Sequence, residues 1–319
     1  MLPMRLVRAA QIACLWACGA GLASGQGYPK TTVRIVTLQP GGSANFAARV
    51  IAEGIAGSLG QPVIVDNRAT SIITAEIVVK APPDGHTLLV GASSFLIGSL
   101  LQTLSYDPVK DFVPITLAVK ECLFLVVHPT LPVTSVRELI AFARTRPGKV
   151  NYSSAGTGGT SHLAAELFKS MAGVDVVRIP YKSAATELPE LLAGQTHMTF
   201  GNASMVLPQF RSGKLRAIAV TGAQPSSLAP ELPTVAAILP GFEAIFYTGF
   251  YAPAGTPVEI VNRLHRESTR VLNRADVKER LFSIGTETVA STPEQSAAII
   301  RAELARWGRL IDDVGIRVD

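Results

Sequence analysis

The chain passes from strand to helix in the run Thr32-Val33-Arg34-Ile35-Val36-Thr37-Leu38-Gln39-Pro40-Gly41-Gly42-Ser43-Ala44-Asn45. The β-branched residues of its first half favour a strand, and Pro40-Gly41-Gly42 favours a turn. Apolar side chains along one face predict a helix from Ser43 to Leu59, and Gly60 stands where helices commonly end. This strand–turn–helix unit is typical of α/β proteins.

Similar units recur along the chain. Further strands are expected at residues 62–66, 87–90, 150–153, 174–179 and 215–221. Helices are expected between and after them at residues 73–80, 135–146, 161–171, 187–192 and 205–211. Strands that alternate with helices predict mostly parallel sheets with helices on both faces.

The alternation occurs in two separate halves, which predicts two lobes. Residues 223–256 are rich in Pro and Gly and indicate a segment that crosses between the lobes. The tail contains two Pro-bearing capping boxes, at Thr256 and Thr292, and no strand pattern, so we expect it to return to the first lobe. The predicted domains are residues 26–124 with 246–319, and residues 125–245.

The net charge of the chain is mildly positive. The 319 residues carry a formal charge of +5, but Lys and Arg are scattered and no basic cluster with interleaved aromatics occurs. Because nucleic-acid surfaces concentrate basic residues on one face, we expect no nucleic-acid partner. No sustained heptad pattern is present, so we expect a monomer.

The N-terminus resembles an export signal. Arg5 and Arg8 precede an apolar stretch at residues 9–23, which ends in the small residues Ala23-Ser24-Gly25. This order predicts a signal peptide at residues 1–25 and a periplasmic protein. Lipid attachment at Cys18 is a less favoured alternative, because Trp16 is unusual before such a site.

Two glycine-rich loops are the candidate binding segments. Residues 39–45 and residues 153–162 each follow an expected strand and open an expected helix. Free backbone N–H groups and the helix dipole favour an anion at such a position. Neither loop contains Lys, Arg, Asp or Glu, so we expect backbone and hydroxyl donors to bind a small carboxylate. The alternative is that both loops are ordinary tight turns.

The sequence offers little for catalysis. It lacks the Gly-x-Ser-x-Gly, Ser-x-x-Lys and His-Glu-x-x-His motifs, and its His residues do not fall at metal-ligand spacing. We therefore predict no catalytic residue, no metal and no cofactor. The neighbours Ser161 and His162 leave a remote alternative, a Ser/His hydrolase, although adjacent residues on a helix do not face each other.

The chain resembles the Bug-type extracytoplasmic solute receptors, which are the receptor component of tripartite tricarboxylate transporters. The similarity is collinear from about Tyr28 to Ile316. The segments that carry it include Pro40-Gly41-Gly42-Ser43, Gly60-Gln61-Pro62-Val63, Pro83-Asp84-Gly85, Tyr106-Asp107-Pro108, Pro147-Gly148-Lys149, Pro180-Tyr181-Lys182, Gly213-Lys214-Leu215 and Ala252-Pro253-Ala254-Gly255.

The resemblance implies a two-domain periplasmic-binding-protein fold, type II-like, with a ligand cleft between the lobes and no catalysis. It also implies a small mono- or dicarboxylate ligand, held by both loops and passed to membrane transport subunits. A ligand sensor that serves a signalling partner is the alternative. The predicted ligand-binding residues are Gly41, Gly42, Ser43, Ala44, Asn45, Ser93, Ser154, Ala155, Gly156, Thr157, Gly158, Thr160, Ser161, His162, Tyr181 and Asn202.

Several positions depart from the family pattern. Asn45 stands where the family usually has Asp, and Leu38 where it often has an aromatic residue. The segment Ala69-Thr70-Ser71-Ile72-Ile73 is shorter than the usual Gly-rich turn, and Ser183 replaces a usual Gly. We expect the fold to tolerate these changes and the ligand specificity to differ, because loss of a negative charge at residue 45 favours an anion.

Overall fold

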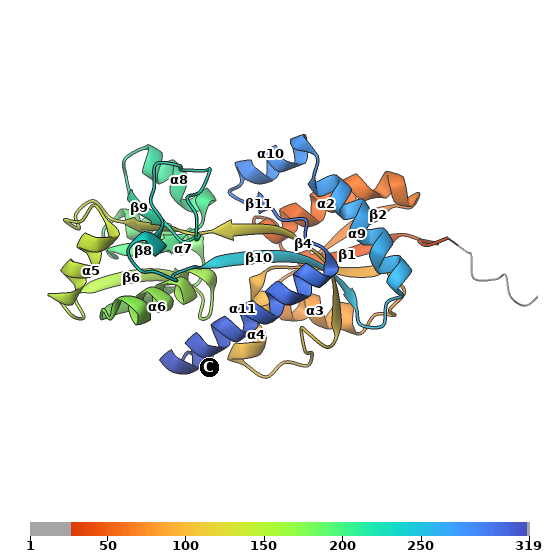
Figure 1. Cartoon of the computed structure of the whole chain (residues 1–319), viewed down its shortest axis with the longest axis horizontal. Helices are drawn as coiled ribbons and strands as arrows, with labels where there is room; N and C mark the ends of the chain where they lie inside the picture. Colours follow the sequence, from red (N-terminus) through yellow and green to blue (C-terminus); the bar gives the residue numbers. More distant parts are fainter. Residues whose placement is uncertain (1–26, 318–319) are drawn as a thin grey trace, which may run out of the picture.

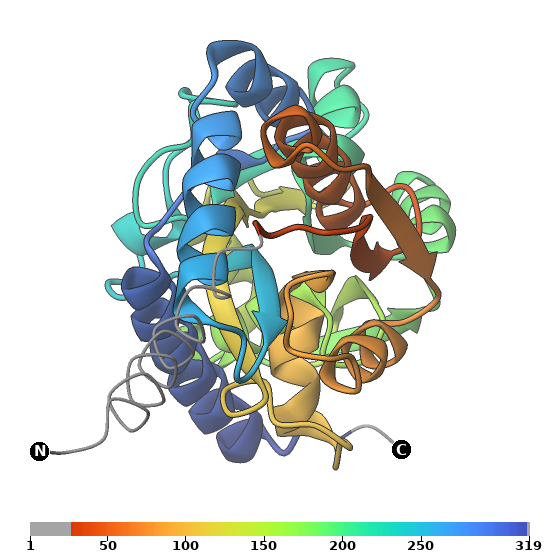
Figure 2. The same ribbon diagram turned by 90° about the vertical axis from the view of Figure 1, so that its right-hand side faces the viewer.

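The computed structural model describes residues 27–317, so the predicted signal peptide at residues 1–25 and Cys18 lie outside the described residues. The protein is elongated, with one β-sheet in each of two lobes and long strands running between them (Figure 1). Figure 2 looks along the long axis with the first lobe in front and shows helices around its sheet.

The first lobe contains a six-stranded sheet in the order β11-β4-β10-β3-β1-β2. Its strands are β1 (Val33–Leu38), β2 (Val63–Arg68), β3 (Thr87–Gly91), β4 (Phe112–Cys122), β10 (Ile245–Pro253) and β11 (Glu287–Thr288). Its helices are α2 (Ser43–Leu59), α3 (Ser71–Val79), α4 (Ser93–Leu101), α9 (Val258–Leu272) and α10 (Ala275–Ser283).

The second lobe contains a five-stranded sheet in the order β7-β6-β8-β5-β9. Its strands are β5 (Phe124–Val127), β6 (Val150–Ala155), β7 (Val176–Tyr181), β8 (Met198–Gly201) and β9 (Arg216–Val220). Its helices are α5 (Val136–Arg144), α6 (Thr160–Ala172), α7 (Ala184–Leu192) and α8 (Ala203–Arg211), with a short 3₁₀ turn η2 (Val235–Ala237).

Both sheets are mixed where the crossing strands enter them. Strand β1 pairs in parallel with β2 and β3, and β6 pairs in parallel with β7 and β8, as strand–helix alternation predicts. Strands β10, β4 and β11 are antiparallel to their neighbours in the first sheet, and β5 is antiparallel in the second. The predicted α/β fold class with two lobes is confirmed, and the crossing strands add the antiparallel pairs.

The C-terminal helix α11 (Pro293–Val314) contacts both lobes. Its N-terminal half places Ile300 in a first-lobe core, whereas Trp307, Leu310 and Ile311 lie in the core that contains Leu125 and Phe168 of the second lobe. Figure 1 shows α11 running along the molecule from one lobe toward the other. The expectation that the tail packs on the first lobe was therefore incomplete, because the apolar stripe of α11 is long enough to cover both.

Local capping signals were mostly interpreted correctly. The hydroxyl of Ser135 accepts the N–H of Glu138 at 3.2 Å, and Thr292 with Gln295 forms a capping box that opens α11. The capping box predicted at Thr256 does not form, because its hydroxyl donates to the carbonyl of Pro253 at 2.7 Å and α9 begins at Val258.

Candidate functional site

Four helix N-termini converge between the lobes. Helices α2 and α4 begin at Ser43 and Ser93 in the first lobe, and α6 begins at Thr160 in the second, while Asn202 caps α8. These four residues line two pockets that share Ser43 and Glu121 and have volumes of about 30 and 220 Å³. We call the two pockets together the cleft.

The cleft is polar and lacks basic side chains. Within the described part of the chain, none of the residues that line it is Lys or Arg. Helices α2, α4 and α6 have no side-chain cap, so their first N–H groups and the positive ends of their dipoles favour an anion, whereas the side chain of Asn202 caps α8. The geometry therefore supplies neutral donors at the positions where the sequence predicted carboxylate binding.

The first glycine-rich loop leaves a buried donor free. Asn45 is 5% exposed and lines the larger pocket. Its Oδ1 accepts a hydrogen bond from Nε of Arg49 at 3.2 Å, but its Nδ2 has no hydrogen-bond partner among residues 27–317. Because a buried amide without a partner costs free energy, Nδ2 is a position where a ligand oxygen would be stabilised. Gly41 beside it has a φ of 112°, a conformation that favours glycine.

The second glycine-rich loop is held from within by Arg178 of β7. Nε of Arg178 donates to the hydroxyl of Ser154 at 2.8 Å, Nη1 to Thr157 at 3.2 Å, and Nη2 to the carbonyl of Gly156 at 2.9 Å. The sequence interpretation considered only charges inside the loop. The fold brings in a guanidinium from the neighbouring strand, and it occupies much of the loop's polar surface.

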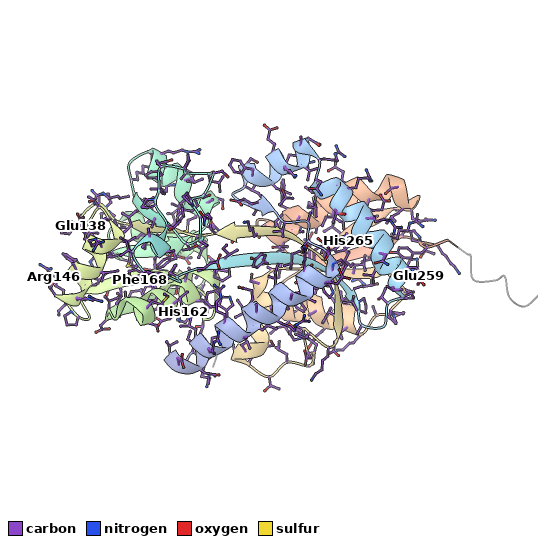
Figure 3. All side chains as sticks on the ribbon, in the orientation of Figure 1. Glu138, Arg146, His162, Phe168, Glu259 and His265 are labelled. Atoms are coloured by element: carbon purple, nitrogen blue, oxygen red, sulfur yellow. The ribbon has the colours of Figure 1, made fainter. Side chains whose placement is uncertain are left out.

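Ser161 and His162 brace the same loop and do not form a dyad. The hydroxyl of Ser161 accepts the N–H of Ala155 at 3.3 Å, and Nδ1 of His162 accepts the N–H of Gly158 at 3.0 Å. Burial, assisted by the positive charge of Arg178, lowers the pKa of His162 to about 4. His162 is therefore neutral at neutral pH and its Nδ1 is engaged. Figure 3 shows it in the second lobe, on the same helix as Phe168.

The structure divides the predicted site residues into two groups. Those that line the cleft are Gly41, Gly42, Ser43, Asn45, Ser93, Thr160 and Asn202. Those that line neither pocket are Ala44, Ser154, Ala155, Gly156, Thr157, Gly158, Ser161, His162 and Tyr181. Ala44 is buried in the first-lobe core, and the carbonyl of Tyr181 accepts the N–H of Gly156 at 3.0 Å. Most of the second group supports the shape of the loop around Thr160.

The crossing strands contribute residues to the cleft that the loop motifs did not predict. Glu121 of β4 and Phe246, Tyr247 and Thr248 of β10 line the cleft. The hydroxyls of Ser43 and Thr248 lie 3.5 Å apart, and the Ser93 hydroxyl donates to the carbonyl of Tyr247 at 3.0 Å. An acidic residue close to the apolar run at residues 122–127 was the available signal for Glu121.

The lobes touch at two glycines on either side of the cleft. A Cβ on Gly158 would lie 2.0 Å from Cδ1 of Leu101, and a Cβ on Gly285 would lie 2.3 Å from Cβ of Ala203. Both glycines have positive φ angles, of 70° and 86°. At these two positions the lobes pack so closely that a side chain larger than Gly would meet the other lobe.

Two further findings concern residues 27–317 only. No group of three or more His, Cys, Asp or Glu side chains there is arranged to hold a metal ion. None of the helices in this part of the chain has the length and apolar character needed to cross a membrane.

Comparison with known proteins identifies the family. Residues 47–316 match the profile described as tripartite tricarboxylate transporter family receptor. The chain belongs to this receptor family. The resemblance inferred from the sequence motifs is thereby confirmed, and the receptor can be compared with its relatives over nearly its whole length.

The relatives agree with the two-lobed architecture of this receptor. It is 34% identical to Protein BugT of Bordetella pertussis, covering 99% of this chain and 100% of that protein. A solved Rhodopseudomonas palustris structure with adipate is 35% identical, with a TM-score of 0.80, over 91% of this chain and 99% of the other. MatC from the same species was solved with bound malate. It is 29% identical, with a TM-score of 0.75, over 89% of this chain and 100% of the other.

Proposed function

We propose that this receptor is exported to the periplasm, captures a small organic mono- or dicarboxylate in the cleft, and delivers it to the membrane subunits of a tripartite tricarboxylate-type transporter. The observation that carries the proposal is that four helix N-termini line the cleft and that the unpartnered Nδ2 of Asn45 lies in its larger pocket. The relatives solved with adipate and with malate support the same ligand class.

The physical basis is the summed effect of several weak donors. One helix N-terminus favours an anion by about 0.3–1 kcal/mol in an exposed position and by more when partly buried. Hydrogen bonds strengthen where the local dielectric constant is low, as in a closed cleft. Four helix starts and one buried amide therefore replace the Arg or Lys that many anion sites use.

Calorimetric titration of the mature chain with adipate, succinate, malate and citrate tests the proposal. We expect at least one acid to bind, and saturation at about 100 times Kd to raise stability by about 2.7 kcal/mol. Asn45→Ala should weaken this binding, because it removes the unpartnered Nδ2 donor. Asn262→Ala, on the exposed side of α9, is the matched control.

The proposal fails if no carboxylate in the panel binds, or if Asn45→Ala and Asn262→Ala bind equally well. Delivery to a transporter is tested separately. Uptake of the bound acid by cells that contain the cognate membrane subunits should require the receptor. Uptake that is unchanged without the receptor would leave binding intact and remove the transport role.

A further inference from the structure

Glu121 occupies the centre of the cleft. It lies near the end of β4, pairs in register with Phe246 of β10, and lines both pockets of the cleft as well as a third pocket of about 170 Å³ behind it. Figure 1 shows β4 and β10 running together from one lobe into the other. An acidic side chain therefore stands where the four helix starts converge.

No cation neutralises Glu121. Among residues 27–317 it takes part in no ion pair, and the Ser43 hydroxyl, which lines the same two pockets, is the group that favours its ionised form. The neighbouring Lys120 is paired with Glu287 at 3.4 Å. A carboxylate at this position thus shares one polar enclosure with the groups that would hold a ligand carboxylate.

The titratable groups around Glu121 come from several elements. They are Lys120 and Cys122 on its own strand, Tyr247 of β10 with Glu243 before it, and Glu287 of β11. The starts of α2, α4, α6 and α8 contribute no titratable side chain to the linings of the cleft. Burial raises the pKa of Glu121 to about 7, and the hydroxyl of Ser43 opposes this shift in part.

An ionised Glu121 and a ligand carboxylate would repel each other across this enclosure, whereas a protonated Glu121 would donate a hydrogen bond to the ligand. We propose that the receptor takes up one proton on Glu121 when it binds its carboxylate ligand. The inference rests on the proposed function. Glu121 would then determine specificity, because it discriminates between solutes by their charge. It would also make the affinity for the ligand depend on the pH of the compartment.

A ligand ammonium paired with ionised Glu121 is the competing arrangement. The cleft disfavours it, because the helix starts and Nδ2 of Asn45 surround the site with hydrogen-bond donors and positive dipole ends. A cation in this position would face the same partial charges that favour an anion. The surroundings therefore favour a neutral Glu121 beside an anionic ligand.

Titration calorimetry with adipate and malate from pH 5.5 to 8.5 tests the proposal, in buffers of different ionisation enthalpy so that proton uptake is counted directly. The wild type should take up close to one proton at pH 8, and its affinity should fall about tenfold per pH unit above pH 7. Glu121→Gln keeps the shape and a donor, so its affinity should be nearly constant across the range. Glu279→Gln, on the exposed side of α10, should retain the wild-type slope.

The outcomes separate the two proposals. Absence of binding at every pH, in both the wild type and Glu121→Gln, would overturn the proposed function itself. Carboxylate binding without proton uptake, or the same pH dependence in Glu121→Gln, would overturn only the role of Glu121. Tighter binding of aspartate than of malate by the wild type, lost in Glu121→Gln, would establish the ammonium arrangement instead. The proton count in the wild type does not depend on how the variant folds.

Discussion

The helix starts at Ser43 and Thr160 differ in where their polar groups are used. In the first loop the amide of Asn45 keeps a donor without a partner, and Ser43 faces the cleft. In the second loop Arg178 and His162 occupy most of the hydrogen-bonding groups, and Thr160 is the residue that reaches the cleft. A similar glycine-rich pattern can therefore leave a donor free at the cleft in one lobe and form a braced support in the other.

The largest predicted difference between the loops is their response to acid. The pKa of His162 is lowered to about 4, so the folded state binds fewer protons than the unfolded chain between about pH 4 and 6.5. Stability contributed by His162 is thus present above pH 6.5 and lost as the pH falls to 4, by about 2–3 kcal/mol. Urea unfolding of His162→Asn should show a smaller acid loss than the wild type. His128→Asn is the control, and an equal change in the two variants would contradict the role of His162.

Removal of Arg178 should break the braced loop. Arg178→Met deletes three hydrogen bonds, and we expect the free energy of unfolding to fall by about 2 kcal/mol. The pKa of His162 should rise at the same time, because the positive charge of Arg178 lowers it. Chemical denaturation with NMR titration of His162 measures both effects. The exposed Arg137→Met is the control, and equal effects of the two variants would contradict the bracing role.

The opposite pH response is expected beside the first loop. The pKa of Glu121 is raised to about 7, so the folded protein binds more protons than the unfolded chain between about pH 4.5 and 7. Glu121 therefore contributes fully to stability in acid, and this contribution is lost as the pH rises to 7. We expect the loss to be about 1–2 kcal/mol, because the side chain is partly exposed. Glu121→Gln should remove this loss in urea unfolding measured at pH 5 and pH 8. If Glu121→Gln keeps the wild-type pH profile, the loss of stability at high pH belongs to another group.

The smallest effect on stability should come from Asn45, the proposed ligand donor of the first loop. Asn45→Ala removes a donor that has no partner in the protein, so unfolding should change by less than about 1 kcal/mol. Ligand affinity should fall about tenfold, which corresponds to about 1.4 kcal/mol. Asn262→Ala should change neither quantity. A loss of affinity no greater than that of the control would show that the first loop does not contact the ligand.

Local sequence determined the units of this protein. The β-branched run at 33–38, the turn at Pro40-Gly41-Gly42 and the Gly60 helix end predicted β1, the loop and α2 at nearly their observed bounds. The same signals located β6 and α6 in the second lobe, and with them two of the four helix starts at the cleft. Such features depend on residues only a few positions apart, so a short window of sequence contains the information.

Tertiary structure alone decided which polar groups remain available to a ligand. Arg178 reaches Ser154 across 24 positions, Thr248 approaches Ser43 across 205, and Trp307 of the last helix stacks on Phe246 with ring centroids 5.4 Å apart. Glu121 faces the cleft because a crossing strand passes between the lobes there. Whether a donor is free depends on all of its spatial neighbours, and most of these are distant in the chain.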